Sequence, residues 1–313
     1  MADATPGFRR LCKRAFRPAG KVADFACSSE RGDYVSSPTV RRRRIARELR
    51  QLREQSAMTL EQAARQLDMS KSNLSRIENG QIGIKPRDVR AALALYGVTG
   101  PSAEALIDTA RSAQERGWWQ SYSDVLPDWF EFYVGLEAEA ASIRTYESET
   151  VPGLLQNESY ARAVFRITAG DDEIERKVSA RLQRQELLQR QPPVELSAVL
   201  NEAVLMRPVG GPAVMGEQLE HLARLAELPT VTIQILPFAV GGHPAMTTPY
   251  VIVGFADVAD EPVVYLDNLT VGHAFEEPDY VARYGELHDR LRNMALSPTL
   301  SVARICDAAR DIR

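Results

Sequence analysis

Apolar residues recur at helical spacing in two short segments that lie next to each other between residues 59 and 80. In the first segment, the apolar positions from Leu60 to Leu67 fall on one face of a helix. Thr59 and Gln62 are three residues apart and form a capping-box start, because each side chain can bond to the backbone amide of the other. The pattern therefore predicts a short helix that begins directly after Thr59.

The second segment follows after a turn of two residues and has its own start and stop signals. Ser70 is a good N-cap, and Leu74 and Ile77 would form the buried face of a helix. Gly80 supplies the left-handed backbone conformation that ends many helices. Two short helices joined by a tight turn are typical of a helix-turn-helix motif.

The outward side of the second helix is rich in hydrogen-bond donors. Its members are Lys71, Ser72, Asn73, Ser75 and Arg76. In a helix-turn-helix protein, residues at the N-terminal end of the second helix contact base edges in the major groove. Arg and Lys side chains suit guanine O6 and N7, whereas Ser reads bases less selectively. A solvated helix face is the alternative for these charges, but the context favours DNA binding.

Residues 41–100 resemble the phage-repressor-like, or Xre-type, helix-turn-helix domain. The matching strings are Ile45-Ala-Arg-Glu-Leu-Arg-Gln-Leu-Arg-Glu54, Thr59 to Leu67, and Ser75-Arg-Ile-Glu-Asn-Gly80. The resemblance implies base-reading side chains at Lys71, Ser72, Ser75 and Arg76, and phosphate contacts at Ser70, Asn73 and Asn79. It also implies a structural ion pair between Arg53 and Glu78. For Asn79 the alternative is ordinary helix-end chemistry, because a glycine follows it.

Three more helices would complete a head of five helices. They are expected at 41–55, at 86–96 and at 101–116. Pro86 suits the first position of its helix, and Gly97 ends it. We assign residues 40–100 to the DNA-binding domain and residues 101–127 to a linker helix with an aromatic connector.

The first 39 residues show no convincing period and are rich in small, polar and basic residues, so we expect disorder. Alternatively, residues 1–34 belong to an over-extended gene model, because a GTG start codon read internally encodes valine and Val35 leads directly towards the first helix. The basic run that follows contains Arg43 and Arg44, which could bind phosphates as an arm. A solvated charge run is the alternative.

Charge is distributed unevenly along the chain. The formal net charge is −4, yet residues 41–100 carry 13 Lys and Arg against 6 Asp and Glu. Residues 101–313 carry 18 Lys and Arg against 32 Asp and Glu. A basic head on an acidic body is typical of a DNA-binding domain joined to a domain with another task. A merely solvated acidic surface is the alternative for the body.

Residues 128–313 combine helical periods with short β-branched runs. Helices are expected at 129–147, 156–168, 172–190, 212–227, 277–296 and 298–311. Strands are expected at 194–200, 230–236, 250–255 and 262–266. The chain is thus expected to be mainly α, with a five-helix head and an α+β C-terminal domain that has one modest sheet.

Two features of this region suggest either packing or a site. Seven aromatic residues lie between Trp118 and Tyr133, and core packing is favoured for them over a pocket or partner groove. Glu202 follows a predicted strand, and a structural ion pair is favoured for its carboxylate. The expected partners are Arg181, Arg184 or Arg207.

The body also resembles the C-terminal domain, of undefined activity, of an actinobacterial family of antitoxin-like transcriptional regulators. The strings that carry this resemblance are Gly117-Trp-Trp119, Leu136-Glu-Ala-Glu-Ala140, Tyr146, Val151-Pro-Gly-Leu-Leu-Gln156, Tyr160-Ala-Arg162, Arg181-Leu-Gln-Arg-Gln185, Leu188, Arg190, Glu202-Ala-Val-Leu205, Gln218-Leu219 and Ile235-Leu-Pro237. Family members often occur beside a gene for a very small companion protein. The resemblance therefore implies a small protein partner.

Motifs for catalysis and for cofactors are missing from the sequence. The four histidines are His221, His243, His273 and His288, and no pair has the HExxH spacing. The Gly-x-Ser-x-Gly and GxxxxGK[ST] motifs are also absent. We expect no enzyme, no metal and no cofactor. The piece Gly241-Gly242-His243-Pro244 is a turn by default, with a ligand contact as the alternative.

The sequence also bears on cellular compartment. Cys12, Cys27 and Cys306 are odd in number and lack the spacing of disulfide pairs or metal ligands. No apolar run is long enough to span a bilayer, and the N-terminus lacks the continuous hydrophobic core of a secretory signal. A cytoplasmic location is expected.

These patterns predict a sequence-specific transcriptional regulator that binds a double-stranded DNA operator as a homodimer. Its body would dimerise or receive a signal from a small companion protein or a ligand. The alternative is an antitoxin-like protein that neutralises a small partner protein and autoregulates its operon. An enzyme with a DNA-targeting head is a third interpretation, and it would need catalysis that survives mutation of Lys71 and Arg76.

Overall fold

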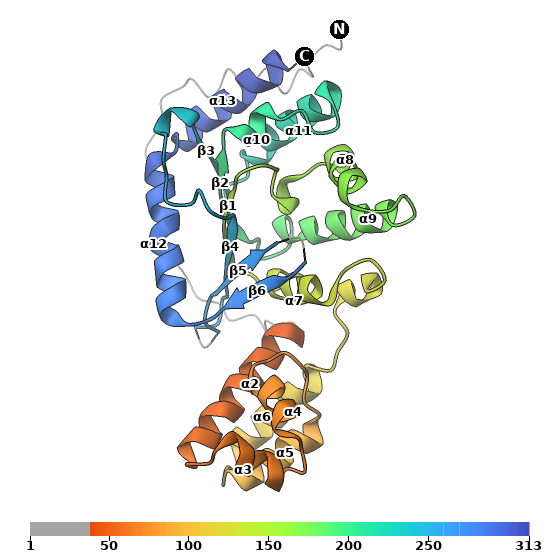
Figure 1. The fold of residues 1–313 in the computed structure, drawn as a ribbon, viewed down its shortest axis with the longest axis vertical. Coiled ribbons are helices and arrows are strands. Elements are labelled where there is room, and N and C mark those ends of the chain that lie inside the picture. Colours follow the sequence, from red (N-terminus) through yellow and green to blue (C-terminus); the bar gives the residue numbers. More distant parts are fainter. Residues whose placement is uncertain (1–37, 259, 269, 313) are drawn as a thin grey trace. The chain divides into compact units, whose positions relative to one another are not determined.

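The computed structural model describes residues 38–258, 260–268 and 270–312 (Figure 1). The expectation of disorder for the N-terminal segment falls on residues that lie almost entirely outside these ranges. The described residues divide into two compact units. The head comprises residues 38–121 and 134–139, and the body comprises residues 122–133 and 140–312.

The head contains five α-helices around one hydrophobic core, as predicted. They are α2 (Pro38–Gln55), α3 (Leu60–Gln66), α4 (Lys71–Glu78), α5 (Pro86–Leu95) and α6 (Pro101–Ser112). A 3₁₀ helix, η1, follows at Trp118–Tyr122. The most deeply buried core side chains include Ile45, Leu49, Leu74, Val89 and Ile107. Each comes from the predicted apolar face of its helix, which explains why the five helices close on one another.

Local chemistry sets the boundaries of the two central helices. The Thr59 hydroxyl accepts a hydrogen bond from the Gln62 amide at 3.2 Å, and the Gln62 side chain accepts one from the Thr59 amide at 2.9 Å. This is the predicted capping box. Gly80, after α4, has φ +68°, and an added Cβ atom would lie 3.5 Å from Cγ of Arg43. There is thus room for a Cβ atom, and glycine is favoured here because of its left-handed backbone conformation.

The first and fifth helices differ from their predicted ranges. The first begins at Pro38, so Pro38 and Thr39 are helical although they were assigned to the N-terminal segment. Proline suits the first turn of a helix, where its missing amide would be unpaired anyway. The fifth, α6, ends at Ser112 and packs its Ile107 into the core shared with α2 and α5. It is therefore part of the head fold.

Leu74 provides a direct test of this core, because its side chain is 1 % exposed. Leu74→Ala should lower the free energy of unfolding of the head by about 2–5 kcal/mol, since it removes apolar contacts and leaves a cavity. Hydrogen–deuterium exchange of α2 to α5 in the full chain would measure this loss. The half-buried Leu52 is the matched control, and Leu52→Ala should cost less. Equal protection in wild type and Leu74→Ala would contradict the assigned core.

The body is built around one six-stranded sheet of order β3-β2-β1-β4-β5-β6. Its strands are β1 (Ser142–Glu147), β2 (Glu195–Asn201), β3 (Val231–Leu236), β4 (Tyr250–Gly254), β5 (Val263–Asp267) and β6 (Gly272–Phe275). The strands β1, β2 and β3 pair in parallel, and β4, β5 and β6 join as antiparallel neighbours. This sheet and the helical head confirm the predicted fold class.

Helices cover both faces of the sheet. Figure 1 shows α12 (Pro278–Met294) along one face, with α8 (Glu158–Thr168) and α9 (Ile174–Gln185) on the opposite side. The remaining helical segments of the body are η2 (Gly153–Leu155), η3 (Glu186–Leu188), α10 (Ala203–Met206), α11 (Pro212–Leu225), η4 (Phe238–Val240) and α13 (Pro298–Asp311). A further helix, α7 (Asp128–Glu137), contributes residues to both units.

A buried histidine links α12 to the sheet. The imidazole of His288 is fully buried, with Nε2 3.1 Å from the Ser197 hydroxyl and Nδ1 3.2 Å from the Tyr250 hydroxyl. Burial lowers the pKa of His288 to about 4, so the ring is neutral near pH 7. A neutral ring with both nitrogens in hydrogen bonds stabilises the packing of α12.

Two predictions for the body are wrong in detail. The expected helix at 129–147 is α7 followed by strand β1, which lies between β2 and β4. Its Ile143, Thr145 and Tyr146 are β-branched or aromatic and favour a strand once neighbouring strands are present. Strand β6 was not predicted. It is only four residues long and lies partly exposed at the edge of the sheet, so its sequence carries little of the apolar pattern of a strand.

Of the three cysteines, Cys306 is buried in α13. Cys12 and Cys27 lie outside the described residues. In the part of the chain that is described, no helix is both long enough and apolar enough to cross a membrane.

The aromatic residues between 118 and 133 fall into two groups, one in each unit. In the head, Trp119 is 4 % exposed and meets Trp118 edge to face, with 6.0 Å between ring centroids. In the body, Phe130 contacts Tyr133, and Tyr133 stacks on Tyr265 at 4.5 Å. These contacts support packing, the favoured interpretation of the cluster.

Candidate nucleic-acid interface

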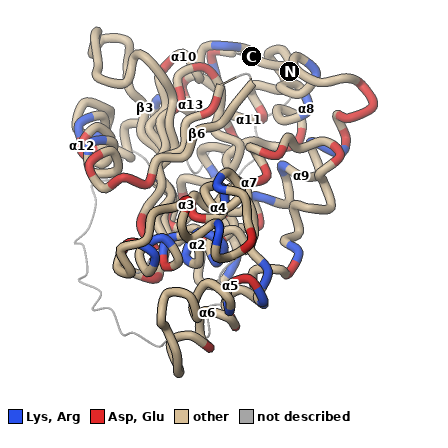
Figure 2. Tube along the Cα trace, turned by 60° about the horizontal axis from the view of Figure 1, so that its bottom comes forward, with Lys and Arg blue, Asp and Glu red and all other residues tan. Residues whose placement is uncertain are grey.

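Helix α4 presents its polar side chains to solvent. The described geometry leaves Lys71, Ser72, Asn73 and Arg76 exposed and Ser75 half-buried, while Leu74 and Ile77 face the core. Figure 2 marks the basic positions along α2, α4 and α5. The four predicted base-reading residues, Lys71, Ser72, Ser75 and Arg76, therefore lie on one short helix. A surface of this kind can donate hydrogen bonds to guanine O6 and N7.

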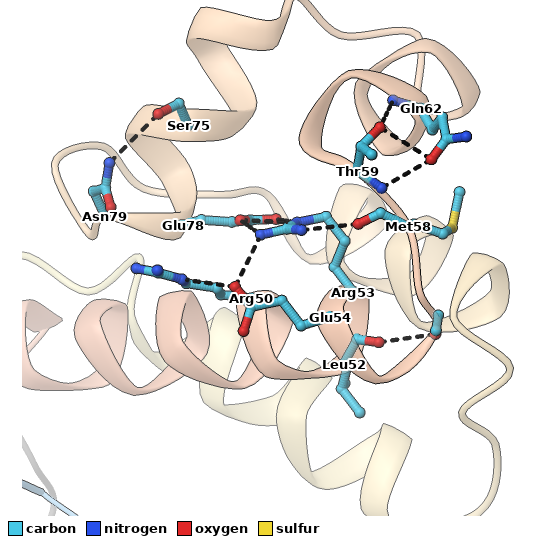
Figure 3. Close-up of polar contacts among 11 residues, drawn as sticks. Arg50, Leu52, Arg53, Glu54, Met58, Thr59, Gln62, Ser75, Glu78 and Asn79 are labelled. Carbon is cyan, nitrogen blue, oxygen red and sulfur yellow. Dashed lines mark hydrogen bonds and ion pairs between the residues drawn. The ribbon is translucent and has the colours of Figure 1, made fainter.

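A buried ion pair holds this helix in place (Figure 3). Arg53 Nε donates to Glu78 Oε1 at 2.8 Å, and Arg53 Nη2 donates to Glu78 Oε2 at 2.9 Å. The two side chains are only 10 % and 4 % exposed. Arg53 Nη1 also donates to the Met58 carbonyl at 2.9 Å. One guanidinium thus joins α2 to α4 and to the turn before α3.

The electrostatics of this pair suit a DNA-binding surface. The hydrogen bonds with Glu78 raise the pKa of the Arg53 guanidinium above its ordinary value. Nearby, burial raises the pKa of Tyr96 to about 12, with a smaller contribution from Glu78. Because the Glu78 carboxylate is buried and bonded to a cation, it does not present an uncompensated negative charge to phosphates. The ion pair implied by the resemblance is present, and its role is structural.

The predicted phosphate-binding residues lie at the two ends of α4. The Ser70 hydroxyl accepts a hydrogen bond from the Asn73 amide at 3.1 Å, so Ser70 is the N-cap. Exposed amides at a helix N-terminus and the helix dipole both favour an anion. Asn79 is the C-cap, and its Nδ2 atom donates to the Ser75 hydroxyl at 3.4 Å. The Asn79 side chain therefore has a local helix-end role and is also exposed.

The structure does not place Arg43 where a phosphate contact requires it. Arg43 is 2 % exposed, because the helical period turns it towards Gly80 after α4. Arg44 is half-buried. Arg41 is also buried and donates to the Ser112 carbonyl at 2.6 Å and to Glu115 at 3.0 Å. The burial of Arg43 does not fit the expected phosphate contact, because residues 41–44 form the first turns of helix α2 and not an extended arm.

Three exposed basic residues beside the motif were not singled out from the sequence. They are Lys85, Arg87 and Arg90, at and after the start of α5. Arg87 Nε lies 3.2 Å from Asp88 Oδ1, which offsets part of its charge. The signal that could have found them is the excess of Lys and Arg directly after the helix-turn-helix segment. They widen the cationic surface of the head.

Ser70 offers a test that separates capping from phosphate contact. Aspartate is also a good N-cap residue, so Ser70→Asp should preserve the stability of α4. The added negative charge would repel a phosphate, so binding to all duplexes should weaken by a similar factor. Fluorescence anisotropy with two unrelated duplexes at several salt concentrations would measure this. A loss confined to one sequence would contradict a phosphate role and indicate base reading.

Glu202 in the body has a structural role, but with a partner that was not predicted. Its carboxylate accepts hydrogen bonds from Arg304 Nε at 2.8 Å and from the Phe238 amide at 2.8 Å. Burial by itself would raise the pKa of Glu202, but the hydrogen bonds from the Phe238 amide and from Arg304 outweigh it, so the pKa is lowered. The expected partners Arg181, Arg184 and Arg207 bond elsewhere, because α13 brings Arg304 to the end of β2 from a distant part of the sequence.

Two of the sequence strings that carry the body's resemblance meet in space. Arg181 Nη1 donates to Gln156 Oε1 at 2.6 Å, and Gln185 Nε2 donates to the carbonyls of Gly153 and Gln156. These bonds fasten α9 to the η2 turn. Within the described residues, no group of three or more His, Cys, Asp or Glu side chains could hold a metal ion.

Comparison with known protein families agrees with this division of the chain. Residues 44–106 match the model of a helix-turn-helix domain. Residues 130–307, more than half of the chain, match the model described as Domain of unknown function (DUF5753). No curated protein and no solved structure is significantly similar to the chain. The chain belongs to the DUF5753 family and carries a helix-turn-helix DNA-binding domain in front of it.

Proposed function

We propose that the protein is a sequence-specific transcriptional regulator that reads its operator with α4. The observation that carries this proposal is the set of exposed donors Lys71, Ser72 and Arg76 on a helix whose opposite face is buried. The Arg53–Glu78 pair holds that helix in one orientation. Base readout needs side chains presented in a fixed geometry, which such a scaffold supplies.

The regulator binds as a homodimer in this proposal. One short recognition helix contacts only a few base pairs, so two heads give a longer and more selective site. The two half-sites would lie about one helical turn of DNA apart, roughly 34–36 Å in the usual geometry. In this proposal the body dimerises, and the protein acts in the cytoplasm.

The body also receives a signal in this proposal and catalyses no reaction. Residues 101–313 carry an excess of acidic residues, 32 against 18 Lys and Arg, which opposes non-specific contact with DNA. A small companion protein or a small ligand would bind the body. The signal would reach the head through α6, which shares the core of the DNA-binding helices. Operator affinity would then change with the state of the body.

Selection from a pool of random duplexes tests this function. The full chain should enrich a limited set of sequences with two-fold symmetric half-sites. Sedimentation of the complex should then give two protein chains per duplex. Failure to enrich any sequence at low salt would overturn sequence-specific binding, whereas an asymmetric site with one chain bound would overturn the homodimer.

A further inference from the structure

A groove of about 450 Å³ opens on the body beside α12. One wall is a face of that helix formed by Tyr280, Arg283, Leu287 and Arg290. Their spacing of three or four residues puts them on the same side of a helix. The other wall is the loop between η4 and β4, which contributes Thr247 and Thr248. This loop contains the glycine-rich turn that stood out in the sequence.

The groove carries two cations on a small surface. Arg283 and Arg290 are exposed and lie two helical turns apart, about 10.5 Å along the axis. In the described part of the chain, neither guanidinium is bonded to a carboxylate. Glu286 is the one acidic side chain among the residues that line the groove, so the lining is cationic. Guanidinium groups bind carboxylate, phosphate and sulfonate oxygens with paired hydrogen bonds.

Aromatic rings lie next to these cations. Phe275 stacks on Tyr280, with 5.5 Å between centroids and 29° between planes. Tyr284 meets Tyr250 edge to face at 5.2 Å. Tyr280 is 49 % exposed, so part of its ring is open to solvent. An exposed ring beside a guanidinium offers both stacking and charge to a flat anion.

The walls are held by buried contacts. Tyr250, which supports Tyr284, is 2 % exposed and bonds to His288. On the loop side, Ala245 is 3 % exposed, and His243 Nε2 lies 3.3 Å from the Tyr146 hydroxyl. Ligand sites in proteins are usually formed before the ligand arrives, and this groove meets that condition.

We infer that this groove binds a small organic anion that carries a planar apolar group. The anionic group bonds to Arg283 and Arg290, and the planar group lies against Tyr280 and Phe275. A volume of about 450 Å³ falls within the usual range for small-molecule sites. Control of DNA binding by such a ligand rests on the proposed function. Binding of the ligand to the groove does not.

The test uses 8-anilinonaphthalene-1-sulfonate, an aromatic sulfonate with a planar naphthalene ring, whose fluorescence rises in an apolar site. The full chain, without DNA, should bind one equivalent in a saturable manner. Arg283→Gln together with Arg290→Gln should weaken binding at least tenfold, because two charge-assisted contacts are lost. Tyr280→Ala should weaken it through loss of stacking. Phenyl phosphate should displace the probe, and the uncharged benzyl alcohol should not.

Arg166→Gln is the matched control. Arg166 is an exposed arginine of the same body, on α8 and away from α12 (Figure 1). This variant should bind the probe as wild type does. Absence of saturable binding, or unchanged affinity in the double arginine variant, would overturn the inference. Since no DNA is present, neither result depends on whether the head binds an operator.

Discussion

Replacing Arg53 with methionine should lower the free energy of unfolding of the head by about 3–5 kcal/mol, because a buried carboxylate would lose its partner. The Glu78 side chain is 4 % exposed and accepts two short hydrogen bonds from Arg53. Methionine fills much of the same volume but cannot donate to Glu78 or to the Met58 carbonyl. Operator binding should fail at temperatures where the wild-type protein still binds.

Hydrogen–deuterium exchange of the full chain would measure this effect separately in head and body peptides. Arg50→Met is the matched control, since Arg50 pairs with Glu54 at the surface and such a pair contributes at most about 1 kcal/mol. Arg53→Met combined with Glu78→Leu should recover part of the loss, because no buried charge then remains. An equally small effect of Arg53→Met and Arg50→Met would show that the buried pair does not stabilise the head.

Arg76→Ala should weaken operator binding by about 1–3 kcal/mol, roughly fivefold to 150-fold, if the guanidinium makes a bidentate contact with guanine. The side chain is exposed in the last turn of α4 and is not part of the core. The loss should be accompanied by relaxed specificity at one base pair of each half-site. Stability of the head should stay within about 0.5 kcal/mol of wild type, as for most surface substitutions.

Titration of wild type and Arg76→Ala against duplexes substituted at each operator position would measure both effects. Arg65→Ala is the matched control, because Arg65 is a highly exposed arginine on α3 that pairs with Glu61. It should lose affinity evenly over all duplexes, if at all. A uniform loss for Arg76→Ala, with specificity unchanged, would assign Arg76 to phosphate contact and contradict base reading.

Most of the head could be predicted from the sequence, because its signals are local. The capping box at Thr59, the N-cap at Ser70 and the stop at Gly80 each involve residues within one helical turn. The apolar period then fixed which side chains of α4 face outward. Arg43 is the exception, since a run of arginines looks like a charged surface until helix α2 turns one of them towards Gly80.

The body was predicted less well, because its structure depends on distant contacts. Strand β1 forms between β2 and β4, whose sequences lie about 50 and 100 residues away. The apolar residues of 142–147 fit a helix as well as a strand when neighbours are unknown. The partner of Glu202 was also missed because Arg304 lies about 100 residues away in the sequence and reaches Glu202 only in the folded chain. The groove beside α12 is lined by residues from three separate segments of the chain, and no sequence motif predicts it.

Footprinting of the full-length protein on the DNA upstream of its own gene tests the central claim most directly, with the Lys71→Ala/Arg76→Ala double variant alongside. Both substitutions lie on the exposed face of α4, so the variant should fold as the wild-type protein does. We predict a discrete, two-fold symmetric protected region with the wild type, and its loss in the double variant at equal protein concentration. Identical protection by the two proteins, or no limited protected region at low salt, would contradict recognition through α4.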